Sequence, residues 1–267
     1  MRVLRGWRRF QEGRTPVLGE LVVVLALLWA YDWVRSKSHP RVGLAQRNGE
    51  DVLRLETRLH IDAEHAANAW VGRHDVLEWV ASLWYQSAHI CITMGVLGWL
   101  WWRHPDRYRV ARNALVLINV AGLVIFALYP CMPPRLLPGR HFVDAIEASG
   151  LGSSPAGPVP ADQYAAMPSL HLAWATWVAV TASLAVGSVV LRRLWRCYPL
   201  VTASVVVVTA NHYVLDIVAG VAVAAVALPL AARLTPQRAA REGGVRGSGD
   251  GPAGRAPARQ GAAAPTP

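Results

Sequence analysis

The chain has 267 residues, of which 53% are hydrophobic and 16% are charged, and it contains 12 tryptophans and three cysteines. This composition is typical of a polytopic membrane protein and argues against an ordinary soluble domain. The net charge of +10 does not indicate a nucleic-acid partner, because the arginines cluster in a few connecting segments. Three widely spaced cysteines predict neither a disulfide framework nor a zinc motif.

Apolar stretches of near-spanning length recur along the chain. A hydrocarbon core about 30 Å thick requires roughly 20 mostly apolar residues per helix. We therefore expect an all-α fold in which six transmembrane helices form a bundle. The predicted helices cover residues 17–34, 77–102, 112–129, 168–190, 198–211 and 212–234. The fifth is short and is expected to form a tight hairpin with the sixth.

The composition changes at both ends of the predicted membrane domain, residues 17–234. Residues 1–16 are basic and lead into the first apolar stretch without a small-residue cleavage site, which favours a membrane anchor. Residues 235–267 are rich in Gly, Pro, Ala and Arg. Such a segment cannot bury a core, and we expect a disordered tail.

Arginine-rich segments alternate with nearly neutral ones along the chain. They are the N-terminal segment, residues 103–112, residues 192–196 and the segment after Arg233. The positive-inside rule places all of them, and both termini, in the cytoplasm. We therefore expect a multi-pass protein of the cell membrane, in which the remaining connections face the extracytoplasmic side.

Both long outer connections carry a recognisable pattern. The first, residues 35–76, has apolar residues at helical spacing, which predicts an amphipathic helix on the outer membrane surface. These residues are Val52, Leu55, Leu59, Ala63, Ala66 and Trp70. The second, residues 130–167, is rich in proline and glycine, as is typical of a functional loop.

Polar residues interrupt the apolar pattern at three places that the topology brings to the outer side. Arg135 follows the third helix, Ser169 and His171 begin the fourth, and His212 and Asp216 begin the sixth. His212 and Asp216 are four residues apart and share a helix face. A carboxylate there can fix the imidazole tautomer and leave the second nitrogen with a lone pair, as a nucleophilic histidine requires.

The segment "MPSLH" (167–171) has the features of a phosphate-binding helix start. Proline is tolerated in a first turn, Ser169 can cap it, and the free N–H groups of a helix N-terminus attract phosphate. His171 could protonate a departing oxygen, and the Arg135 guanidinium matches phosphate oxygens. Together these groups indicate phosphoryl transfer.

The segments "PPR", "MPSLH" and "NHYVLD" resemble the three signature motifs of the phosphatidic-acid phosphatase type 2 superfamily. The resemblance covers residues 76–234 and is closest to the inositolphosphotransferase branch, which includes inositol phosphorylceramide synthases. It implies that His212 forms a phosphohistidine, Asp216 orients it, His171 acts as general acid, and Arg135 and Ser169 hold phosphate oxygens. It implies no metal and no cofactor, a phospholipid substrate, and an alcohol acceptor such as inositol.

Two positions depart from the phosphatase form of these motifs. Leu128 stands where a lysine precedes the first motif's arginine, and Val206 stands where an arginine precedes the third motif's histidine. These departures favour the transferase branch over the phosphatase. Arg140, Tyr164 or His89 could supply a missing contact.

Other interpretations remain open from the sequence. A lipid phosphate phosphatase of the same superfamily is the nearest alternative, and a non-enzymatic membrane transporter is the alternative of another class. His212 and Asp216 could instead form a structural pair. A zinc site formed by His171, His212 and Asp216 lacks a metal-binding motif such as HExxH, and a serine protease lacks a glycine-flanked serine.

Overall fold

The computed structural model describes residues 15–38, 41–150 and 164–236. Within these residues the chain is helical and contains no strand, which confirms the predicted all-α class. Its elements are α2 (Val17–Ser38), α3 (Val42–Leu59), α4 (Glu64–Val71), α5 (Asp75–Arg103), α6 (Pro105–Leu128), the 3₁₀ turn η2 (Pro134–Leu136), α7 (Ala145–Ala148), α8 (Leu170–Ala185), α9 (Val189–Val208) and α10 (Val214–Leu234).

The helices belong to one unit of the chain, Met1–Thr235, and Pro236–Pro267 form a second unit. The predicted basic segment and the predicted disordered tail lie almost entirely outside the described residues.

Apolar helices indicate a membrane protein. Among the residues that the structure describes, three helices are long and apolar enough to cross a bilayer, with spans at Val17–Val34, Pro105–Leu128 and Val214–Leu234. Leu170–Ala185 is apolar but shorter. Large apolar side chains on α2, α5, α6, α9 and α10 are exposed, as lipid-facing surfaces require. A bundle of six spans stays a prediction.

The boundary between the fourth and fifth predicted helices is wrong. α8 ends at Ala185, because the chain turns at Gly187 and the Ser188 hydroxyl caps α9 by accepting from the Leu191 N–H at 3.4 Å. The arginine-rich segment 192–196, expected in a connection, therefore lies in the first turns of α9. With 16 residues, α8 is about 24 Å long at 1.5 Å per residue.

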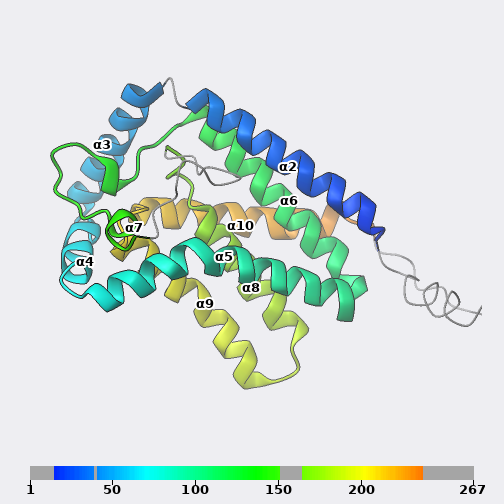
Figure 1. Cartoon of the computed structure of the whole chain (residues 1–267). Helices are drawn as coiled ribbons and strands as arrows, with labels where there is room; N and C mark the ends of the chain where they lie inside the picture. Colours follow the sequence, from blue (N-terminus) through cyan, green and yellow to red (C-terminus); the bar gives the residue numbers. More distant parts are fainter. Residues whose placement is uncertain (1–14, 39–40, 151–163, 237–267) are drawn as a thin grey trace, which may run out of the picture. The chain divides into compact units, whose positions relative to one another are not determined.

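The short helix α8 lies at the centre of the bundle. It packs against α5, α6, α9 and α10, while α2 runs alongside α6 (Figure 1). Trp177 of α8 is fully buried and donates its indole N–H to the Ala111 carbonyl at 2.8 Å. This bond satisfies the polar atom of a large side chain inside an apolar core.

The start of α6 meets the ends of α8 and α10 at one end of the bundle. Contacts there join the starts of α2 and α6 to the ends of α8 and α10: Arg107 to the Leu184 carbonyl, Arg112 to Glu20 at 3.7 Å, and Asn113 to the Thr235 hydroxyl at 2.9 Å. At the starts of α8 and α10, the Ser169 N–H donates to the Asp216 carbonyl at 3.0 Å. The end with these two helix starts carries the polar residues singled out above.

The single amphipathic helix expected in the first outer connection is two helices, α3 and α4. The chain breaks at His60, which has a left-handed φ of 56°. Leu55 and Leu59 of the predicted apolar face are exposed, whereas Val52 is buried. The residues that α3 buries are Ala45, Gly49, Val52 and Glu56. Contact of this helix with the membrane surface stays a prediction.

Candidate functional site

His171 and His212 form a histidine pair in direct contact. His212 Nε2 lies 3.2 Å from His171 Nδ1, and the two rings meet edge to face with centroids 5.3 Å apart. His212, in the turn before α10, is only 3% exposed. The two residues are far apart in sequence, and the bundle brings them together through the starts of α8 and α10.

The surroundings of His212 determine which nitrogen carries its proton. His212 Nδ1 lies 2.8 Å from the Ala166 carbonyl oxygen and 3.4 Å from Asp216 Oδ2. Both neighbours are acceptors, so Nδ1 carries the hydrogen and Nε2 keeps its lone pair. His171 Nδ1 must then donate to that lone pair. This arrangement leaves a nucleophilic nitrogen next to a proton donor.

Asp216 has two neighbours that compete for the same oxygen. Its Oδ2 accepts the Tyr213 backbone N–H at 3.0 Å, which caps the start of α10, and faces His212 at the longer distance. The side chain is fully buried. The sequence predicted Asp216 as the group that orients His212, and the structure adds the closer Ala166 carbonyl, which no side-chain motif reveals.

Ser169 is the N-cap of α8 and lies against α10. Its hydroxyl oxygen accepts the Leu172 N–H at 3.4 Å. The two helices approach so closely here that a Cβ on Gly220 would lie 2.2 Å from the Ser169 carbonyl oxygen. This contact sets the separation of the two helix starts, and with it the contact within the histidine pair.

Arg135 is fixed beside the turn that carries His212. Its backbone N–H donates to the Ala210 carbonyl at 2.9 Å and its Nε to Asn211 Oδ1 at 2.8 Å. A terminal nitrogen pairs with Asp144 Oδ2 at 2.5 Å, so an acidic residue already balances this cation. Asp144 also caps α7. The sequence did not identify either partner: Asn211 opens the motif "NHYVLD" but was given no role, and Asp144 lies in the second outer connection.

Two residues of α5 pack on His171. The Tyr85 ring stacks on it with centroids 4.3 Å apart and an interplanar angle of 23°, and the His89 ring lies at 4.1 Å. His89 Nδ1 contacts the Tyr85 carbonyl at 2.9 Å. Tyr85 and His89 are polar aromatic residues one turn apart inside an apolar helix. This pattern could have indicated from the sequence that Tyr85, as well as His89, lies at the site.

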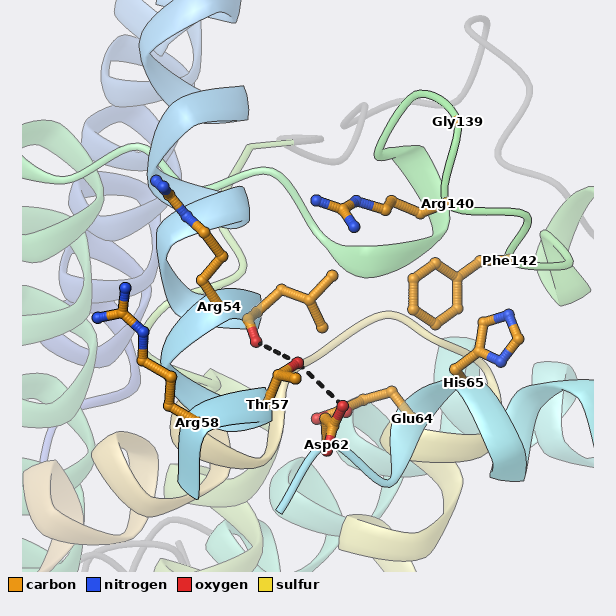
Figure 2. Close-up of a pocket in the computed structure, with 10 residues that line it drawn as sticks. Arg54, Thr57, Arg58, Asp62, Glu64, His65, Gly139, Arg140 and Phe142 are labelled. Atoms are coloured by element: carbon orange, nitrogen blue, oxygen red, sulfur yellow. Dashed lines mark hydrogen bonds between the residues drawn. The ribbon is translucent and has the colours of Figure 1, made fainter. Parts of the chain in front are cut away.

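A separate polar pocket lies between α3, α4 and the loop after η2. Its volume is about 540 Å³, and its lining includes Arg54, Arg58, Asp62, Glu64 and Arg140. Figure 2 shows Arg140 from the loop and Glu64 from α4 on different sides of this space. Arg140, considered above as a phosphate contact, therefore lines this pocket.

The described part of the chain holds no group of three or more His, Cys, Asp or Glu side chains placed to bind a metal.

One comparison with known proteins, against family profiles, identifies the family of this chain. The profile of the PAP2 superfamily matches residues 50–230, a range that contains all five residues predicted for the site. No curated protein and no solved structure matches the chain. Since the profile covers well over half of the chain, the protein belongs to the PAP2 superfamily.

Proposed function

We propose that the protein is an integral membrane phosphotransferase, which moves a phosphoryl-containing group from a lipid to an acceptor through a phosphohistidine on His212. Membership of the PAP2 superfamily supports a lipid phosphatase or phosphotransferase. The observation that carries the proposal is the 3.2 Å contact between His212 Nε2, which keeps a lone pair, and His171 Nδ1.

In the first step, His212 Nε2 attacks the phosphorus atom of the lipid. The N–P bond forms as the bond between phosphorus and the leaving oxygen breaks, and His171 gives its proton to that oxygen. The Ala166 carbonyl, at 2.8 Å, and Asp216 stabilise the proton that remains on His212 Nδ1. The imidazole can therefore accept the phosphoryl group without changing tautomer.

In the second step, the acceptor oxygen attacks the phosphohistidine. His171, now neutral, takes the acceptor's proton, and the N–P bond breaks to restore His212. An alcohol such as inositol gives a new phosphodiester or phosphate ester, and water gives hydrolysis. The same two histidines thus serve both steps, with His171 alternating between acid and base.

The histidine pair must separate for the first step. Phosphoryl transfer requires the attacking and leaving atoms roughly in line on either side of phosphorus. The direct contact within the pair leaves no room there. We expect the His171 ring to move away from His212 Nε2 when the phosphate enters, and its stacking on Tyr85 defines the surface along which it moves.

Arg135 and Ser169 are the proposed phosphate ligands. The Ser169 hydroxyl accepts from Leu172, which leaves its hydrogen free for a phosphate oxygen. Arg135 is held by Asn211 and Asp144 in a fixed orientation, which suits a preorganised cation.

The departures at Leu128 and Val206 support the transferase branch. Leu128 is 77% exposed at the end of α6, while Val206 is fully buried in α9 and its carbonyl accepts from the His212 N–H at 3.3 Å. Neither position supplies a cation. With Arg135 as the main cation, a substrate of lower charge, such as a phosphodiester, fits better than a phosphate monoester.

We propose six membrane-spanning helices, with the histidine pair facing the extracytoplasmic side. The arginine-rich start of α6 lies against the end of α8, and α9, the next helix, begins with Arg192, Arg193 and Arg196 in its first turns. The positive-inside rule assigns that end to the cytoplasm. The histidine pair, between the starts of α8 and α10, then opens to the other side.

The experiment that tests the function offers the purified protein a panel of phospholipids labelled in the headgroup, with and without free inositol. Inositol-dependent product supports the transferase, and headgroup release without an acceptor supports the phosphatase. Loss of turnover in His212→Ala separates either enzyme from a transporter. Unchanged turnover in that variant would contradict both enzymatic proposals.

A further inference from the structure

Two glutamates outside the sequence motifs hold the start of α10. Glu56 Oε1, on α3, accepts the Leu215 N–H at 2.6 Å, and Glu64 Oε1, on α4, accepts the Val214 N–H at 2.7 Å. With Asp216, which accepts from Tyr213, three carboxylates bind three consecutive N–H groups. Carboxylates at a helix N-terminus are stabilised by these donors and by the helix dipole.

The second oxygens of the glutamate pair, Glu56 and Glu64, need a proton. Both side chains are fully buried, and Oε2 of each has no hydrogen-bond donor among the described residues. The two carboxyl groups bind the N–H groups of adjacent residues, Val214 and Leu215, so they lie beside each other at the start of α10. Two neighbouring buried carboxylates oppose each other's ionisation, whereas one shared proton would satisfy both oxygens.

We propose that Glu56 and Glu64 share one proton and act together as positioning residues for His212 and Asp216. This inference rests on the proposed function, because it assigns the pair a role in the same phosphoryl transfer. His212 immediately precedes the N-cap residue of α10, and Asp216 lies in its first turn. Fixing the first N–H groups of α10 therefore fixes both residues relative to His171.

Close packing around the start of α10 couples the position of His212 to the position of α3. A Cβ on Gly49 of α3 would lie 2.6 Å from the Met132 carbonyl and 2.9 Å from the Tyr213 hydroxyl, so α3 already touches the residue next to His212. Tyr213 also donates to Met132 at 2.8 Å. A change in the charge or length of Glu56 is therefore transmitted to the turn that carries His212.

The surroundings of the pair favour retention of the proton. Burial, with the adjacent Glu64 carboxylate, raises the pKa of Glu56 to about 9. The titratable and charged groups nearby are Asp216 and Tyr213 at the start of α10, Cys131 in the loop after α6, and Asp62, His65, Arg54, Arg58 and Arg140 around the pocket that Glu64 lines (Figure 2).

The sign of the pH effect follows from the raised pKa. The unfolded chain loses the Glu56 proton near 4.5, and the folded chain keeps it until about 9. Between these values the folded state binds one more proton, so stability falls as the pH rises. The pair's contribution is complete below 4.5 and is lost above about 9.

The test compares Glu56→Gln with Glu56→Ala in the full-length protein in detergent. Glutamine can still accept from Leu215 and donate to Glu64, so it imitates the protonated pair. We expect Glu56→Gln to keep a kcat close to the wild-type value and to flatten the fall of Tm between pH 5 and 9. We expect Glu56→Ala to lower kcat on the order of 10²-fold with little change in KM, because a displaced catalytic group costs about that much.

Asp62→Asn is the matched control, since Asp62 lines the same pocket and bonds Thr57 at 2.9 Å without capping α10. It should leave kcat and the Tm profile unchanged. A Tm profile in Glu56→Gln identical to that of the wild type, or a wild-type kcat in Glu56→Ala, would overturn the proposal. If the wild type turns over no lipid phosphate, the proposed function fails, while the Tm comparison still decides whether the glutamates share a proton.

Discussion

At the scale of single residues, the neighbours of His212 determine which of its two ring nitrogens carries the hydrogen. Nδ1 is tied to Ala166 and Asp216, and Nε2 faces His171. The sequence predicted His171, His212 and Asp216 because ionisable residues are rare in apolar helices. Their catalytic roles remain predictions. The contact between His212 and the Ala166 carbonyl could not be predicted, because a backbone carbonyl can belong to any residue type and therefore defines no sequence motif.

Arg135→Lys tests the proposed phosphate cation. Lysine cannot reproduce the guanidinium bonds to Asn211 and Asp144, so its charge would not be held beside the turn with His212. We expect kcat/KM to fall on the order of 10²-fold. Arg140→Lys, in the separate pocket, is the control and should retain activity. Equal losses in both variants would argue against a specific role for Arg135.

The activity should also depend on pH in a bell-shaped manner. His212 must be neutral to attack and His171 must be protonated to act as an acid, so turnover requires both states at once. We expect kcat/KM to rise and then fall across neutral pH when it is measured on one labelled lipid. A flat profile from about pH 5 to 8 would contradict the paired roles.

At the scale of helices, the site depends on how closely α8 and α10 approach. The sequence predicted that both helices begin near the polar residues, because the motifs lie next to apolar runs. It did not predict that α3 and α4 cap α10. Glu56 lies one turn after the buried Val52 on the same face, and a carboxylate at such a position can be recognised as a buried cap only once its N–H partner is known.

Gly220→Ala tests whether the site depends on the close packing of α8 against α10. The added Cβ would lie 2.2 Å from the Ser169 carbonyl oxygen, and a backbone atom cannot move without separating the two helices. We expect a loss of about 1–3 kcal/mol in stability and a marked fall in turnover. In Gly122→Ala the Cβ meets the end of the Leu170 side chain, which can rotate, so the Tm in detergent should change less. A larger loss in Gly122→Ala would contradict this explanation.

At the scale of the whole bundle, the arginine-rich start of α6 and the histidine pair lie at opposite ends of α8. Arg107 at the start of α6 contacts Leu184 at the end of α8, and the next helix, α9, carries Arg192, Arg193 and Arg196 near its start. The orientation that the sequence predicted from the alternation of charged segments stays a prediction. The sequence placed helix boundaries less well, since the Ser188 cap and the turn at Gly187 moved Arg192 to Arg196 from a connection into α9.

Cysteine labelling tests the orientation in intact cells. In a protein with the exposed Cys91 and Cys197 replaced by serine, Arg140→Cys should react with a membrane-impermeant thiol reagent added outside. Gly187→Cys, in the turn between α8 and α9, should react only after permeabilisation. The native Cys131 is buried and should contribute little. Labelling of both positions from the same side would reject the proposed topology.

The account depends most on a covalent intermediate at His212. The direct measurement is rapid acid-free quenching of the full-length protein with a phosphorus-labelled lipid substrate, followed by mapping of the labelled peptide. We predict an acid-labile phosphoryl group on His212 during turnover and none in His212→Ala. Turnover with the label on another residue, or undiminished turnover in His212→Ala, would contradict the account.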